Sequence, residues 1–94
     1  MNSSQRAKLR AMANTIDTIF QIGKDKISDN MIEMLSDALE ARELIKGTVL
    51  KTSGLTAKQA IDELCSRLEA EPIQAIGRKV VIYRESKENK KIFI

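Results

Sequence analysis

The sequence predicts an α/β domain in which an N-terminal helix is followed by the order β-α-β-α-β-β, with a mixed four-stranded sheet. Three observations lead to this fold class. Apolar residues recur at helical spacing in three segments, apolar runs of strand length follow each of them, and short loops join the pieces. Strand–helix–strand alternation produces parallel crossovers, and the last two strands form an antiparallel hairpin. A length of 94 residues suits one domain covering residues 1–94.

The first predicted helix covers residues 3–16, and a strand over residues 18–22 follows it. Helical spacing is seen at Leu9, Met12, Ala13 and Ile16. Arg6 and Arg10 lie one turn apart on a common stripe of this helix. The strand ends at Gly23, where a basic loop begins.

The second predicted helix begins at Ser28 or Asp29, because either residue can cap it. Its apolar face is formed by Met31, Ile32, Leu35 and Leu39. Its other face carries acidic residues at successive i,i+4 positions: Asp29, Glu33 and Asp37. Such a face repels a polyanion, so we expect only the N-terminus of this helix to belong to a phosphate site.

The second predicted strand covers residues 43–51. One face presents Ile45 and Val49, and the other presents Lys46 and Thr48. Gly47 lies between them, where glycine weakens a strand or marks a bulge. Ser53-Gly54 then forms a turn.

The third predicted helix opens with a capping box, in which Thr56 and Gln59 satisfy each other's free amides. Its inward positions are Ala60, Ile61, Leu64, Cys65 and Leu68. Pro72 suits the first residue of a strand. Residues 73–76 and 80–83 are expected to form a hairpin, which turns at Gly77-Arg78-Lys79 and displays two cations. The tail after it is polar and is expected to be solvated.

The composition argues against an enzyme. The chain has no histidine and one cysteine, Cys65, which is expected to be buried filler. No catalytic residue, metal ligand or cofactor site is therefore predicted, and Glu40 and Glu43 have no metal-ligand partners nearby in the sequence. Aromatic residues make up only 3%, so base stacking on an aromatic platform is not expected. No apolar run reaches the roughly 20 residues of a membrane span, and a cytoplasmic protein without membrane contact is expected.

Charge is segregated along the chain. Residues 1–16 carry a net charge of +3 and residues 72–94 carry +4, whereas residues 28–42 carry −3 and residues 54–71 carry −2. Such segregation predicts one basic and one acidic face. The loop Gly23-Lys24-Asp25-Lys26 precedes a helix N-terminus, where free amides and the helix dipole attract anions. Taken alone, however, such a loop is more often a solvated turn.

Three segments resemble the YhbY-like family of single CRM domains (chloroplast RNA splicing and ribosome maturation): IDTIFQIGKDKISDNMI, ALEARELIK and IGRKVVIYRESKENKKI. The resemblance covers nearly the whole chain in the same order. It implies a fold similar to the C-terminal domain of a bacterial translation initiation factor. It also implies RNA binding and association with precursors of the large ribosomal subunit.

The family hallmark is a GxxG-type loop, usually Gly-Lys-Gly-Gly. Gly23 and Lys24 match it, whereas Asp25 and Lys26 replace the last two glycines. Aspartate places a negative charge where a phosphate is expected, and Lys26 can supply a side-chain cation in compensation. Gly47 stands where a β-branched residue is more usual in the family. Arg42, Glu43 and Lys46 are matched around the second strand.

The sequence thus predicts a monomeric protein that binds structured ribosomal RNA in large-subunit precursors, with no small-molecule substrate. The predicted RNA-binding residues are Gly23, Lys24, Lys26, Arg6, Arg10, Arg42, Lys46, Gly77, Arg78, Lys79 and Arg84. The alternative is a protein-interaction adaptor whose acidic helix faces dock a basic ribosomal partner. A third possibility, DNA binding, lacks a groove-reading helix because both later helices are acidic along their exposed sides.

Overall fold

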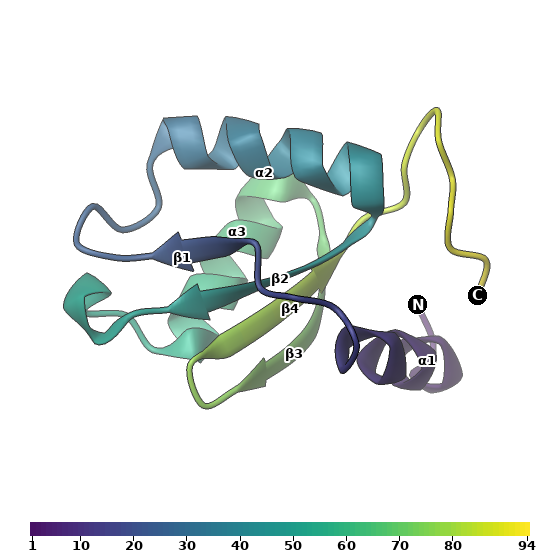
Figure 1. Ribbon diagram of the computed structural model, residues 1–94, viewed down its shortest axis with the longest axis horizontal. Helices are drawn as coiled ribbons and strands as arrows, with labels where there is room; N and C mark the ends of the chain where they lie inside the picture. Colours follow the sequence, from purple (N-terminus) through teal and green to yellow (C-terminus); the bar gives the residue numbers. More distant parts are fainter.

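The computed structural model describes residues 1–94 and contains three helices, a four-stranded sheet and a short 3₁₀ helix (Figure 1). In chain order the elements are α1 (Ser3–Ala13), β1 (Phe20–Ile22), α2 (Asp29–Arg42), β2 (Leu44–Val49), η1 (Lys51–Ser53), α3 (Ala57–Leu68), β3 (Glu71–Ile76) and β4 (Lys79–Tyr83). The strand order is β1-β2-β4-β3, with β1 parallel to β2 and the other pairs antiparallel. The predicted α/β class and mixed sheet are confirmed.

Several boundaries differ from the sequence prediction. Helix α1 ends at Ala13, where the Lys46 Nζ donates to the Ala13 carbonyl at 3.2 Å and turns take over. Strand β2 starts one residue later than predicted, at Leu44, because Glu43 takes a φ of 66° and ends α2. The strand also ends at Val49, and the unpredicted η1 follows it. Ser28 rather than Asp29 caps α2, accepting from the Met31 amide.

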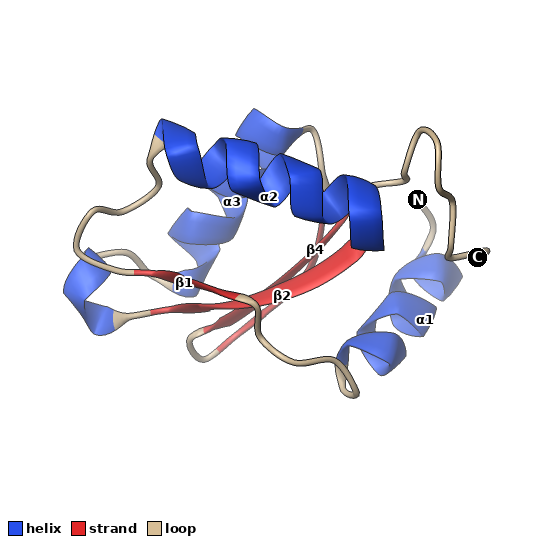
Figure 2. Cartoon of the chain, turned by 45° about the horizontal axis from the view of Figure 1, so that its top comes forward, coloured by secondary structure: helices blue, strands red, loops and turns tan.

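The sheet separates two apolar clusters. Helices α2 and α3 cover one face, whereas α1 lies on the other side (Figure 2). The larger cluster has 14 buried residues and includes Ile45 and Val49 as predicted. The smaller cluster has seven, among them Leu9 of α1 and Ile92 of the C-terminal segment. Cys65 is only half-buried beside the larger cluster, and desolvation, followed by Glu71 and Asp62, raises the pKa of its thiol to about 11.

Gly47 neither marks a bulge nor breaks the ladder, contrary to the sequence prediction. It lies opposite Phe20 in the parallel β1–β2 register and pairs with Val80 on its other side. A Cβ at this position would lie 2.3 Å from the Phe20 ring. The missing side chain therefore makes room for a buried aromatic ring, which fills the space that a β-branched residue would occupy.

The C-terminal segment after β4 is anchored by two carboxylates. The side chains of residues 87–91 are exposed, as expected of a solvated tail, but Ser86 and Ile92 are buried. Fully buried Glu43 accepts from the amides of Ser86, Lys91 and Ile92 at 2.5–2.8 Å. Desolvation raises the pKa of Glu43, but these three hydrogen bonds outweigh it and the net pKa is lowered. Glu40 accepts from the Ser86 hydroxyl and from two further amides, and these bonds lower its pKa as well.

No helix of the structure combines the length and apolar character needed to cross a bilayer.

Candidate nucleic-acid interface

Four exposed lysines gather at one end of the sheet, which we call the basic end. They are Lys24 and Lys26 after β1, Lys51 in η1 and Lys79 at the start of β4. Backbone hydrogen bonds hold these elements together, since the Leu50 amide donates to Ile22 at 2.8 Å and the Val49 amide donates to Arg78 at 2.7 Å. In Figure 1 the loop, η1 and the β3–β4 turn all project at the left. The basic end thus combines three segments far apart in the sequence.

The loop between β1 and α2 is fixed rather than extended into solvent. The Lys26 amide donates to the Gly23 carbonyl at 2.9 Å and closes a turn. Ile27 is buried in the larger cluster, and Arg67 of α3 donates to the Ile27 carbonyl at 3.1 Å. Lys24 and Lys26 are therefore presented from a constrained backbone next to the N-terminus of α2, a geometry suited to an anion.

The loop residue with a positive φ is the last one, Lys26, and not the first, Gly23. Lys26 takes a φ of 56°, so the left-handed conformation falls on the last residue of the loop motif. Gly23 does not need a positive φ, and a Cβ there would meet Leu50 at an ordinary 3.6 Å. Lys26 thus accepts a backbone conformation typical of glycine while adding a cation.

Five of the predicted residues do not form one surface with the loop: Arg6, Arg10, Arg42, Lys46 and Arg84. Arg10 and Arg42 are exposed in the last turns of α1 and α2, at the opposite end of the sheet from the loop (Figure 1). Arg6 pairs with Glu71 at 2.9 Å, and Lys46 is bound to the end of α1. The Arg84 guanidinium donates to the Ser36 and Leu68 carbonyls at 2.7 and 3.1 Å. The structure therefore divides the predicted footprint into two ends.

Lys51 is the one member of the basic end that the sequence prediction missed. Its nearness to the loop follows from topology, because parallel strands bring their carboxyl ends to the same edge of a sheet. Residues 23–26 leave the end of β1, and Lys51 leaves the end of β2. Because parallel pairing was expected from the sequence, it could have predicted that Lys51 lies near the loop after β1.

Arg78 lies at the basic end, but its guanidinium points into the fold. Its Nη2 donates to the Leu55 carbonyl at 2.6 Å, its Nε donates to Val49, and a longer contact reaches Leu50. Gly77 beside it takes a φ of 59° and allows the tight turn. Arg78 therefore fastens the hairpin turn to the segment that follows β2.

Replacing Arg78 by lysine is expected to lower the free energy of unfolding by about 1–3 kcal/mol, because a single nitrogen cannot reproduce the bonds that the separate Nε and Nη2 donors make to Val49, Leu50 and Leu55. Urea denaturation checks this value. Lys79→Arg serves as the control, since Lys79 is exposed and makes a single hydrogen bond to Thr48. Equal stability of Arg78→Lys and the parent would show that the guanidinium bonds contribute nothing.

Comparison with known proteins adds the decisive observation, since the family model of the CRS1 / YhbY (CRM) domain matches residues 1–84. The chain belongs to this family. A relative in Bacillus subtilis, named probable RNA-binding protein YqeI, is 40% identical over 98% of this chain and 96% of its own length. A Haemophilus influenzae protein named RNA-binding protein is 26% identical over 96% of this chain and 91% of its own length.

The solved structures include a CRM-domain neighbour as well. The solution structure of the hypothetical protein SAV1595 from Staphylococcus aureus, described as a candidate RNA-binding protein, superimposes with a TM-score of 0.75. It is 44% identical, and the match covers 100% of this chain and 98% of that one. The resemblance identified from the loop and strand motifs is therefore confirmed at the level of family and fold.

Proposed function

We propose that this CRM domain binds structured ribosomal RNA through its basic end and acts in the cytoplasm, as a monomer, on precursors of the large ribosomal subunit. The observation that carries the proposal is the gathering of Lys24, Lys26, Lys51 and Lys79 from three segments at one end of the sheet, with Lys24 and Lys26 next to the N-terminus of α2. The relatives named as RNA-binding proteins support the choice of RNA as the ligand.

The proposed mechanism is binding without chemistry. Lysine ammonium groups and helix amides contact backbone phosphates, which position a protein without reading sequence. Discrimination then comes from the shape of the folded RNA, because its phosphates must match cations on a rigid surface. The turn closed by Lys26 and the buried Ile27 provide that rigidity at the loop.

The loop is tested by the double substitution Lys24→Ala with Lys26→Gly. Glycine at position 26 keeps the positive φ and removes only the cation, whereas alanine there would add backbone strain. Loss of two phosphate contacts is expected to weaken RNA binding about tenfold or more. It should also reduce the slope of log affinity against log salt by about 1.4–1.8. Fluorescence anisotropy with a large-subunit ribosomal RNA fragment, measured across a salt series, gives both numbers.

The matched control is Lys8→Ala with Lys87→Ala, which removes two exposed lysines outside the basic end. We expect this control to change the affinity far less. An equal loss in both double variants would mean that net charge, and not the loop, determines binding. Unchanged binding in the loop variant would refute the assignment. Duplex DNA at equal salt, as a competitor, distinguishes RNA from general polyanion binding.

The adaptor alternative is less well supported by the helix faces on which it depends. Asp29 and Glu63 both pair with Arg67, and Asp62 pairs with Lys58 at 2.8 Å. Three of the acidic side chains thus already have a cationic partner within the fold, whereas Glu33, Asp37 and Glu69 form no salt bridge. Cosedimentation of the loop variant with ribosomal particles separates the two functions, because an adaptor retains association and an RNA-binding protein loses it.

A further inference from the structure

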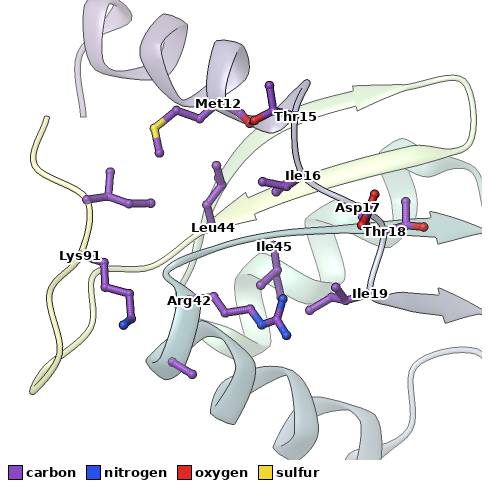
Figure 3. Close-up of a pocket in the computed structure, with 12 residues that line it drawn as sticks. Met12, Thr15, Ile16, Asp17, Thr18, Ile19, Arg42, Leu44, Ile45 and Lys91 are labelled. Carbon is purple, nitrogen blue, oxygen red and sulfur yellow. The ribbon is translucent and has the colours of Figure 1, made fainter.

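A groove of about 900 Å³ lies at the end of the molecule opposite the basic end. Its walls come from the end of α1, residues 14–19, the last turn of α2, the start of β2 and the C-terminal segment (Figure 3). This volume falls within the roughly 300–1,000 Å³ typical of binding clefts. The groove takes no part in the RNA site proposed above.

The floor and walls of the groove are aliphatic. The apolar lining residues include Met12, Ile16, Ile19, Leu44, Ile45 and Ile92, and none of the lining residues is aromatic. Met12 and Ile19 are 39% and 38% exposed, so apolar carbon remains in contact with water on both sides of the groove. Leu44, Ile45 and Ile92 are buried below them, so Met12 and Ile19 supply most of the exposed apolar surface. Exposed apolar side chains beside a polar rim are a feature of protein interaction sites.

The rim of the groove is cationic. Arg42 extends from the end of α2 toward Ile19 and Ile45, and Lys91 flanks the groove from the C-terminal segment (Figure 3). Neither side chain forms a salt bridge. Asp17 is the one acidic residue of the lining. Charge complementarity therefore favours a ligand that places carboxylates beside apolar groups.

We propose that this groove docks an amphipathic helix of a partner protein, with aliphatic side chains on one face and aspartate or glutamate beside them. The aliphatic side chains enter between Met12 and Ile19, and the carboxylates meet Arg42 and Lys91. This is the helix-in-groove mode of recognition, in which anchors recur every three or four residues. Because the groove and the basic end lie at opposite ends, RNA and this partner can be bound at the same time.

Two other occupants fit the groove less well. An unstacked RNA base is held best between planar groups, and the groove offers no aromatic ring and a single guanidinium, that of Arg42, among aliphatic side chains. An extended strand requires an open sheet edge, and β1 on that side has only three residues. The groove therefore fits a helix better than either a base or a strand.

The proposal is tested by site-specific crosslinking in the cells that produce the full-length chain. A photoreactive benzoylphenylalanine replaces Met12, and the same residue replaces Met34 in a control chain. Met34 is a matched control, because it is 53% exposed and lies on α2 outside the groove. The crosslinked fragments are identified by mass spectrometry. We expect the Met12 chain, and not the Met34 chain, to yield a protein segment with helical aliphatic spacing and adjacent acids.

Substitutions in the groove provide the second readout. In the Met12 crosslinking chain, Ile19→Glu is expected to lower the yield of that fragment about tenfold, whereas Met34→Glu leaves it unchanged. Lys91→Glu reverses an exposed rim charge and is expected to lower the yield of that fragment as well. It serves as the second variant in case Ile19→Glu disturbs the fold. An RNA fragment at Met12, a basic segment, or no fragment above the Met34 level would overturn the proposal. RNA affinity measured on the same variants remains at the parent value, so the outcome is independent of the RNA assignment.

Discussion

Replacing Gly47 by alanine is expected to lower the free energy of unfolding by about 1–3 kcal/mol, and valine is expected to cost more. The reason is steric, since even the first carbon of a side chain would lie 2.3 Å from the Phe20 ring. The ring is 6% exposed and packs in the larger cluster, so it has little room to move away. Chemical denaturation of the two variants and the parent measures the loss.

A double-mutant cycle attributes this loss to the ring. In a Phe20→Leu background the clash is relieved, and Gly47→Ala is expected to cost much less than in the parent. Gly23→Ala is the control, because its Cβ makes only ordinary contacts and a change within about 0.5 kcal/mol is expected. A full loss that persists in the Phe20→Leu background would place the strain elsewhere in β2.

Replacing Glu43 by alanine is expected to lower the free energy of unfolding by about 3 kcal/mol or more, because three backbone amides lose their acceptor at a buried site. These amides belong to Ser86, Lys91 and Ile92, so the C-terminal segment should detach before the sheet unfolds. Amide hydrogen exchange detects this as faster exchange at the three positions, alongside a lower urea midpoint.

Helix geometry supplies a matched control for Glu43. Glu69 also ends a helix with a positive φ, 54° against 66° for Glu43, but its side chain is exposed. Glycine relieves backbone strain at both positions, and Glu69→Gly is therefore expected to be neutral or slightly stabilising. Glu43→Gly should still destabilise strongly. Equal effects at the two sites would mean that the carboxylate of Glu43 holds nothing.

The same carboxylate predicts sensitivity to acid. The pKa of Glu43 is lowered in the folded protein, so its contribution to stability is complete above the ordinary value of 4.5. That contribution is lost as the pH falls through the lowered folded-state pKa. Unfolding measured between pH 7 and pH 3 should therefore show a fall in stability below pH 4.5 that is reduced in Glu43→Gln.

Local sequence signals predicted the elements well where the partners of each residue lie close along the chain. The capping box of Thr56 and Gln59 and the turn at Gly77 depend on neighbours within three residues, and both form as expected. The strand–helix–strand order likewise follows from periodicity and the handedness of crossovers. The basic loop was located by the same means.

What the sequence did not reveal depends on contacts between distant residues. Arg78 and Arg84 read as exposed cations, yet they donate to carbonyls 16 to 48 residues away. In the sequence Glu43 was considered only together with Glu40, as carboxylates without metal-ligand partners, although its acceptor role involves amides 43 to 49 residues later. A cationic side chain that is exposed to solvent and one that joins two segments by hydrogen bonds have the same local sequence pattern. Only the fold distinguishes the two.

The neighbouring chain ends have a consequence for engineering the molecule. The side-chain Nε2 of Gln5 donates to the Ile94 carbonyl at 3.4 Å, and Figure 1 places both ends beside α1, away from the basic end. A short linker between them should therefore permit a circular permutant, with new ends opened at the exposed Gly54, where an added Cβ would meet no atom within 4 Å. In such a chain the lysine loop and its helix stay intact, while the order in which the strands emerge from the ribosome is changed.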